Sequence, residues 1–230
     1  MVDNAIFYDK TIKCPVCDTQ FETKRVRTRK LKALKRHDDF FVSYEGVNPF
    51  YYHVWICPQC GYSATESGYE EKLTKAQRDF LYAQIATKWK QRDFGKVRTF
   101  EEAQESYKLA LIVGQLLKKP KAYIGGLCLS LAWLHREQNS SKEKDFLQFA
   151  LNCYSEAYET EPLPLGNLDE ISVSYLLGEL NRRLGYYPEA IRWYAKTLEH
   201  PDIKNKRMIQ LKSRTQWQLA KEEYDLNKRG

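Results

Sequence analysis

Two short cysteine motifs decide the fold of the first part of the chain: Cys14-Pro15-Val16-Cys17 and Cys57-Pro58-Gln59-Cys60-Gly61. In each motif two thiols lie two residues apart, so both sulfur atoms can turn toward one point. Two such pairs supply the four thiolates of a closed tetrahedral zinc site. The prolines stiffen the two turns, and Gly61 can adopt the positive φ often needed just after such a turn. We therefore predict a structural Zn²⁺ ion bound by Cys14, Cys17, Cys57 and Cys60.

The 39 residues between Cys17 and Cys57 carry the signals of β-structure. Phe21–Thr28, Asp39–Tyr44 and Tyr51–Ile56 alternate or are rich in aromatic and branched side chains, as strands are. The turn signal at residues 45–49 predicts a hairpin between the last two of these strands. A domain of this size gains only about 3–5 kcal/mol from its core, whereas structural zinc adds on the order of 10 kcal/mol. We therefore predict a zinc-ribbon-like β domain over residues 1–68 that a chelator unfolds.

From residue 69 onward the pattern is helical, with apolar residues at three- and four-residue spacing. A repeat of the form Ala-x3-Tyr-x2-Ala/Thr begins at Ala103, Ala150 and Ala190. A large residue followed by a small one precedes each copy, at Ile85-Ala86, Leu131-Ala132 and Leu177-Gly178. These features resemble the tetratricopeptide repeat, although the spacings of 47 and 40 residues exceed its period of about 34 residues. The resemblance implies an α-solenoid over residues 69–230, with three helical pairs and a basic final helix, Lys204–Asn227.

The two halves together resemble an uncharacterised family of Gram-positive, Firmicutes-type bacteria. The resemblance covers nearly the whole chain. Its most specific part is the double Cys-Pro-x-Cys region, with the run Tyr8–Thr11 and the stretch Tyr44–Pro49. It implies an α+β, mostly α fold, with a zinc-ribbon-like region followed by tetratricopeptide-like helices. It implies no activity, because the family is known as a domain of unknown function.

Composition and charge narrow the classes of protein. Hydrophobic residues make up 43% and charged residues 29%, which is ordinary for a soluble protein. No secretory signal is visible, and no apolar run approaches the roughly 20 residues of a membrane span. With paired cysteines, these features predict a reducing, cytoplasmic setting without membrane contact. The net charge of +7 suits acidic protein partners or nucleic acid.

The helical half offers a candidate binding groove. In tetratricopeptide proteins, the first helix of each pair lines a concave surface that holds peptides. Carried over to this chain, that arrangement gives Lys90, Trp133, Arg136, Tyr175, Glu179 and Arg182 as groove residues. The three cations among them suit an acidic segment or a terminal carboxylate. We therefore predict an adaptor that binds a protein or peptide; the alternative is a groove that is too short or is filled by the zinc domain.

Two further hypotheses remain open. The run Lys24–Arg36 holds eight cations and no acid, and neighbouring aromatic residues could stack on bases. Nucleic acid would then contact Arg25, Arg27, Arg29, Lys30 and Lys32. We prefer a solvated strand face, because nearby acids balance this charge. The other hypothesis is a redox-sensitive zinc switch, which requires exposed, electropositive thiolates.

Catalysis has little support in the sequence. The chain has no nucleophile elbow, phosphate-binding loop, dinucleotide-binding turn or HExxH motif. None of the four histidines has a convincing partner in the sequence. We therefore predict that the protein is not an enzyme, and the sequence leaves its oligomeric state open.

Overall fold

The computed structural model describes residues 4–229. The chain forms two compact units, which we call unit 1 (residues 1–36 and 42–119) and unit 2 (residues 37–41 and 120–230). The described part of the chain is mostly helical, with small antiparallel strand pairs near the N-terminus, as predicted. The change from β to helical character near residue 69 falls inside unit 1. The domain boundary at residues 68 and 69 stays a prediction.

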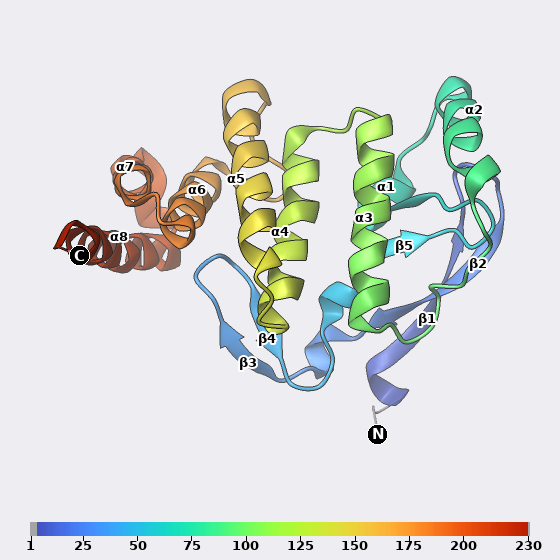
Figure 1. Ribbon diagram of the computed structural model, residues 1–230, viewed down its shortest axis with the longest axis horizontal. Helices are drawn as coiled ribbons and strands as arrows, with labels where there is room; N and C mark the ends of the chain where they lie inside the picture. The colour runs from blue at the N-terminus through green and yellow to red at the C-terminus, as the bar shows by residue number, and fades with distance from the viewer. Residues whose placement is uncertain (1–3, 230) are drawn as a thin grey trace. The chain divides into compact units, whose positions relative to one another are not determined.

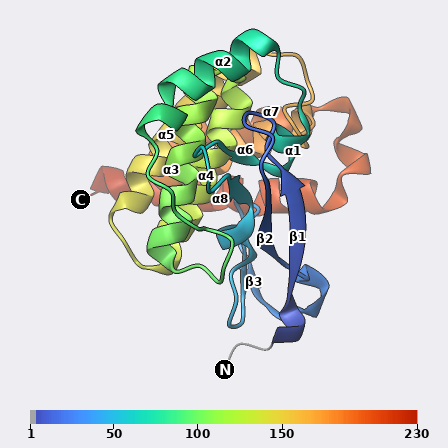
Figure 2. The same ribbon diagram turned by 90° about the vertical axis from the view of Figure 1, so that its right-hand side faces the viewer.

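The strands of unit 1 form three two-stranded antiparallel sheets (Figures 1 and 2). The first pairs β1 (Phe7–Lys13) with β2 (Gln20–Val26), and the second pairs β3 (Ala33–Arg36) with β4 (Val42–Tyr44). The third pairs β5 (Val54–Ile56) with β6 (Ser63–Thr65). The first cysteine motif forms the turn between β1 and β2, and the second forms the turn between β5 and β6. Each half of the cysteine cluster therefore sits at the end of its own hairpin.

The hairpin predicted between residues 39–44 and 51–56 is wrong. β4 pairs with β3, and β5 pairs with β6. The intervening chain forms a 3₁₀ helix, η3 (Pro49–Tyr52), because Pro49 has no N–H to place in a sheet and suits a first helical turn. The Asn48 side chain caps this helix by accepting a hydrogen bond of 2.8 Å from the Phe50 amide. Two further 3₁₀ helices in this region are η1 (Asn4–Ile6) and η2 (Thr28–Lys30).

Four helical segments complete unit 1: α1 (Glu66–Glu70), α2 (Lys75–Gln84), η4 (Ala86–Lys88) and α3 (Phe100–Leu116). Thr74 and Thr99 begin α2 and α3 with capping boxes, in which a side chain three residues later returns a hydrogen bond. α3 packs against β5, β6 and η3. The resulting core joins the cysteine motifs to Trp55, Tyr62, Tyr69, Leu81 and Val113.

A buried arginine fixes the strand that leads to the second cysteine motif. The Arg98 Nη1 donates to the carbonyl oxygens of Tyr51 and Val54 at 2.9 and 2.8 Å, and its Nε donates to that of Phe94 at 2.8 Å. Burial lowers the pKa of Arg98 to about 10, which still leaves it charged at neutral pH. These hydrogen bonds position η3 and the start of β5.

Unit 2 is helical. It comprises α4 (Lys121–Glu137), α5 (Lys142–Thr160), α6 (Glu170–Leu184), α7 (Tyr187–Glu199), η5 (Pro201–Asn205) and α8 (Arg207–Arg229). Each α-helix from α4 to α7 packs against the next one in the chain (Figure 1). The predicted final helix corresponds to α8. No helix within residues 4–229 has the length and apolar character needed to cross a membrane.

The Ala-x3-Tyr-x2-Ala/Thr repeat has a packing origin. All nine of its residues, on α3, α5 and α7, are buried. A Cβ atom at Gly178 would lie only 2.7 Å from the Tyr194 ring, so the glycine makes room for the tyrosine. However, the α3 copy belongs to unit 1, and the preceding pair Ile85-Ala86 lies at the end of α2 and in η4. The three-pair tetratricopeptide solenoid therefore stays a prediction.

Candidate metal centre and charged sites

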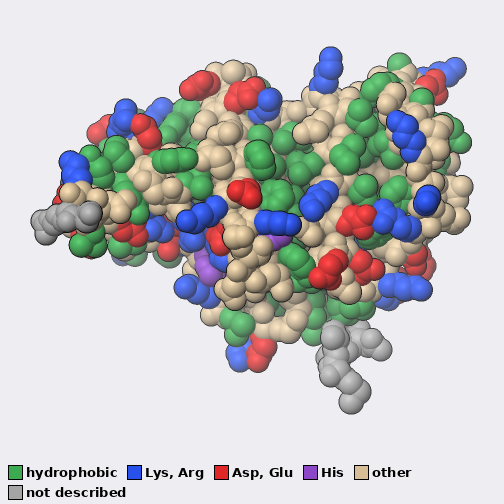
Figure 3. All heavy atoms as spheres, in the orientation of Figure 1, with side chains coloured by type: hydrophobic (Ala, Val, Ile, Leu, Met, Phe, Trp, Pro, Cys, Tyr) green, Lys and Arg blue, Asp and Glu red, His purple; other side chains and the backbone are tan. Residues whose placement is uncertain are grey.

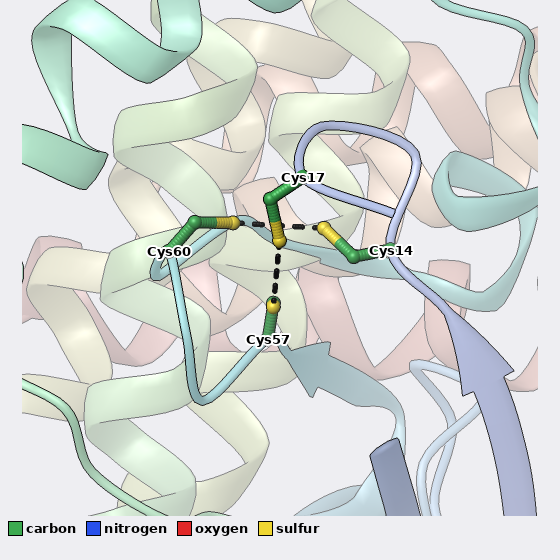
Figure 4. A group of neighbouring side chains, drawn as sticks. All are labelled: Cys14, Cys17, Cys57 and Cys60. Atoms are coloured by element: carbon green, nitrogen blue, oxygen red, sulfur yellow. Dashed lines mark hydrogen bonds between the residues drawn. The ribbon is translucent and has the colours of Figure 1, made fainter. Parts of the chain in front are cut away.

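The four predicted metal ligands come together. The Sγ atoms of Cys14, Cys17, Cys57 and Cys60 all lie within 4.8 Å of one another and face a common point (Figure 4). The Sγ atoms of Cys14 and Cys60 are 3.6 Å apart, as are those of Cys17 and Cys57. Sulfur atoms about 2.3 Å from a tetrahedral zinc ion would be about 3.8 Å from one another. All four cysteines are free thiols. Their spacing therefore fits a metal ion held by four thiolates.

The two motifs adopt the same turn. The amide of Asp18 donates to the Cys14 carbonyl at 3.0 Å, and the amide of Gly61 donates to the Cys57 carbonyl at 2.9 Å. The residue after each motif has a positive φ, +61° at Asp18 and +74° at Gly61, which confirms the prediction for Gly61. The amide of Val16 also lies 3.4 Å from the Cys14 sulfur, where it favours the thiolate.

A tryptophan that no sequence motif indicates covers the second motif. The Trp89 Nε1 donates to the Pro58 carbonyl at 2.8 Å. A Cβ atom at residue 61 would lie 2.5 Å from the indole ring, so only glycine permits this close approach. Trp89 follows η4, and no fixed spacing relates it to the cysteines, so the sequence carries no local signal of this contact.

Burial limits access to the sulfur atoms. Cys14, Cys57 and Cys60 are buried, whereas Cys17 is partly exposed and donates to the Thr19 hydroxyl at 3.2 Å. A redox switch requires accessible thiolates, and Cys17 is the one member of the cluster with some access. The redox hypothesis stays a prediction.

The thiols of the cluster share their protons. Hydrogen bonds from the Cys14 and Cys60 thiols lower the pKa of Cys57. The pKa of Cys14 is raised by its hydrogen bond to Cys57, and that of Cys60 by its hydrogen bond to Cys14. One sulfur thus loses its proton readily, while further negative charges so close together repel one another. A divalent cation removes this repulsion, so metal binding would release protons.

A second buried polar cluster lies in unit 2 and is organised by Asp39. This fully buried carboxylate accepts hydrogen bonds from Arg136 at 2.6 and 3.0 Å and from the Trp133 Nε1 at 3.0 Å. The Arg183 Nε lies 3.7 Å away. Burial alone would raise the pKa of Asp39, but the Arg136 hydrogen bond, the charges of Arg183 and Arg136 and the Trp133 hydrogen bond lower it overall. Asp39 is therefore ionised at neutral pH.

Glu179 is the other fully buried acid of this cluster. It accepts hydrogen bonds from Arg182 at 3.0 and 3.1 Å, from Arg183 at 2.7 Å and from the Tyr194 hydroxyl at 2.8 Å. Arg182 also pairs with Glu223 of α8 at 2.9 Å. The charges of the helical core are thus compensated from several helices.

The structure brings together five of the six predicted groove residues: Trp133, Arg136, Tyr175, Glu179 and Arg182. They lie in the interior of unit 2, where the side chains of Arg136 and Arg182 are only 14% and 12% exposed. Two of them, Trp133 and Arg136, bind Asp39 of the segment His37–Phe41. Part of the region expected to belong to the zinc domain therefore fills this site, which was the alternative raised for the groove.

Lys90 does not belong with these residues. It is exposed in the loop after η4, in unit 1. Its neighbour Trp89 has an extended backbone and is tied to Pro58, so the chain leaves the helical conformation before residue 90. The predicted placement of Lys90 on a groove-lining helix is therefore wrong.

Four of the eight cations of the basic run Lys24–Arg36 pair with groups in unit 1. Lys24 pairs with Asp9 at 2.7 Å, Arg25 with Glu66 at 2.7 Å and Lys32 with Glu45 at 3.0 Å. Arg27 donates to the backbone carbonyls of Ala5 and Phe7. Arg29 and Lys30 are exposed on η2. On the face drawn in Figure 3, basic and acidic side chains are interspersed. The nucleic-acid hypothesis stays a prediction.

The fold and the cysteine cluster define a mostly helical α+β protein with four buried or partly buried cysteines that could hold a metal ion. A family model described as "Uncharacterized protein conserved in bacteria (DUF2225)" matches residues 7–220, so the chain belongs to that family. An uncharacterised protein of Borreliella burgdorferi is 24% identical over 221 residues, which cover 84% of this chain and 77% of that protein. No solved structure matches the chain. The resemblance to an uncharacterised bacterial family is thereby confirmed.

Proposed function

We propose that this protein is a non-enzymatic, zinc-containing adaptor of the cytoplasm, in which the zinc is structural and the helical unit binds another protein. The convergence of four cysteine sulfurs on one point carries the proposed zinc site. Four thiolates complete a tetrahedral site, so no coordination position stays open for a substrate. The ion would hold the β1–β2 and β5–β6 turns together, and the residues packed around these turns form the core of unit 1.

Metal analysis of the purified full chain tests the structural site. We expect one zinc per chain by inductively coupled plasma mass spectrometry, and loss of that zinc in Cys14→Ser and Cys57→Ser. Cys128→Ser is the matched control, because Cys128 is a buried thiol of α4 outside the cluster. A single iron ion would suit the same ligands, and its visible absorbance would contradict the assignment of zinc. A metal-free chain with an unchanged fold would contradict the structural role.

The adaptor role is supported by the way unit 2 holds the segment His37–Phe41. Side chains of α4, α6 and α8 bind its carboxylates and a backbone carbonyl, as a peptide-binding surface would. Cross-linking and affinity capture from native cells, with and without nuclease, tests this role. We expect protein partners that survive nuclease treatment. Partners that disappear with nuclease would instead support nucleic-acid binding through the basic run.

The buried positions of Arg136 and Arg182 set a limit on how binding can be tested. A Glu substitution at either position would bury an unpaired acid, so loss of capture would report unfolding rather than loss of contact. Variants for binding studies therefore belong in the segment His37–Phe41 itself.

A further inference from the structure

We infer that the site on unit 2 that holds residues 37–41 recognises acidic–aromatic peptide segments, and that the chain's own segment is a resident ligand which a partner's segment replaces. We call His37–Phe41 the tip segment, because it connects β3 to β4. The inference rests on the proposed adaptor role and names the chemistry of the partner. That partner carries an aspartate followed by two aromatic residues.

Three hydrogen-bond donors of α4 bind the Asp39 carboxylate. Two nitrogens of Arg136 bind the two oxygens of Asp39, and Trp133 Nε1 binds one of the same oxygens. A planar guanidinium that grips both oxygens is specific for a carboxylate, since an amide can satisfy only part of this geometry. The first requirement on a ligand is therefore a negatively charged side chain.

The two residues after the carboxylate have aromatic partners on two helices. Phe41 stacks on Trp133 of α4, with ring centroids 5.5 Å apart and planes inclined by 22°. Phe40 packs on Tyr175 of α6, with centroids 5.5 Å apart. Such pairs add to the free energy of binding beyond the apolar area they bury. The second requirement is an aromatic residue at each of these two positions.

The main chain of the tip segment is also bound. The Lys212 Nζ of α8 donates to the backbone carbonyl of His37 and to the Asp38 carboxylate, both at 3.1 Å. The contact with the backbone carbonyl does not depend on the residue type, whereas the contact with Asp38 favours a second acid before the aspartate. Together, α4, α6 and α8 contact all five residues of the tip segment.

The tip segment is an imperfect occupant. Phe40 has a φ of +71°, a left-handed conformation that bulky residues adopt at a cost in free energy. Beside it, the fully buried Tyr175 hydroxyl has no hydrogen-bond partner among the described residues. A linear peptide, free of the two flanking strands, can relax this strain and reach the Tyr175 hydroxyl.

The buried charges of the site determine how a partner peptide can replace the tip segment. The Nε of the buried Arg136 pairs with Glu143 at 2.7 Å, whereas its Nη1 and Nη2 bind Asp39. Removing the tip segment without a substitute would leave these two Nη groups without acceptors, which is unfavourable in the interior. The site therefore exchanges one carboxylate for another rather than standing open. The resident segment also competes as a tethered ligand, at an effective concentration on the order of millimolar. A peptide must therefore bind the intact protein weakly and a variant with a loosened tip segment tightly.

The test uses the zinc-loaded full chain and a fluorescein-labelled peptide with the sequence of residues 34–44, followed by fluorescence anisotropy. Phe41→Ala loosens the tip segment and leaves the Asp39–Arg136 pair in place. We expect it to bind the peptide at least tenfold more tightly than the natural chain. A peptide with Asn at the position of Asp39 should bind at least tenfold more weakly. Phe40→Ala, at a half-buried position, provides the same test should Phe41→Ala fail to fold.

Two results would overturn the inference. One is a folded Phe41→Ala variant, with a sharp thermal transition, that binds the peptide no better than the natural chain. The other is equal binding of the Asp and Asn peptides. Zinc content and partner capture, measured on the same preparations, separate this failure from failure of the proposed function. A protein that holds zinc and captures partners but ignores the peptide leaves the adaptor role standing and removes this site from it.

Discussion

Units 1 and 2 each contain a buried polar cluster, and the charges of the two clusters are compensated in different ways. In unit 1, four sulfur atoms lie within 4.8 Å of one another, and the charge that would balance four thiolates has to come from an ion. In unit 2, Asp39 and Glu179 are both fully buried, and arginines of the same unit balance them. Unit 1 should therefore respond to metal and unit 2 to pH and to substitution.

The largest effect should come from removing the metal. A chelator, or Cys57→Ser, should unfold the cysteine turns and the strands around them, because structural zinc contributes on the order of 10 kcal/mol. Hydrogen exchange read by mass spectrometry should show loss of protection in β1, β2, β5 and β6, with protection retained in α4 to α8. Cys128→Ser should leave both units protected. Equal loss of protection in both units would show that they do not respond separately.

The next largest effect should come from Arg136→Ala. This change removes the bidentate partner of the buried Asp39 carboxylate. We expect it to lower the free energy of unfolding by about 3–5 kcal/mol. Urea unfolding, followed by NMR amide signals of α6, measures the loss. The control is Arg192→Ala, because the Arg192 side chain is 70% exposed. The double variant Asp39→Leu with Arg136→Met should recover most of the stability, since it removes both charges together.

Acid should weaken unit 2 through Asp39. The pKa of Asp39 in the folded chain lies below its ordinary value of 3.8, so its ionised form stabilises the fold. This stabilisation is complete above the unfolded pKa and is lost as the pH falls through the folded pKa. The urea midpoint of the α6 signals should therefore drop below pH 4, and the difference between the natural chain and Asp39→Asn should shrink there. A difference that stays constant with pH would contradict this assignment.

The smallest effect should come from Lys212→Ala. Its ion pair with Asp38 is partly exposed, with side chains 25% and 38% accessible. We expect a loss of about 0.5–1 kcal/mol, because solvent screens such pairs. Thermal unfolding at low and high salt measures it, and the difference between Lys212→Ala and the natural chain should decrease with salt. A loss as large as that of Arg136→Ala would place Lys212 among the buried charges.

The sequence predicted the cysteine cluster well, because its signal is local. Two residues separate the members of each pair, and that spacing alone brings both sulfurs to one side of a turn. The strand pairing was harder to predict, because the stretch at residues 45–49 marks a turn without saying which strands it joins. In the structure, Pro49 and the Asn48 cap direct the chain into η3. The predicted hairpin failed for this local reason.

The contents of the helical site could not be predicted from the sequence. The resemblance to the tetratricopeptide repeat gave Trp133, Arg136, Tyr175, Glu179 and Arg182 as one set. Their neighbour Asp39 is 97 residues away from Arg136 in the chain. Contacts at such separation leave no periodic signal, and a single sequence offers no other indication of them.

The position of the tip segment has a consequence for inheritance. Unit 2 takes residues 37–41 from a point in the chain that precedes most of unit 1. No single cut yields a contiguous piece that contains all of unit 2 and none of unit 1. A gene fragment that encodes the helices alone would lack Asp39, and in its product the two Nη groups of Arg136 would lose the acceptors that Asp39 supplies. Recombination should therefore pass the two units on together, in keeping with a family match that runs unbroken from residue 7 to residue 220.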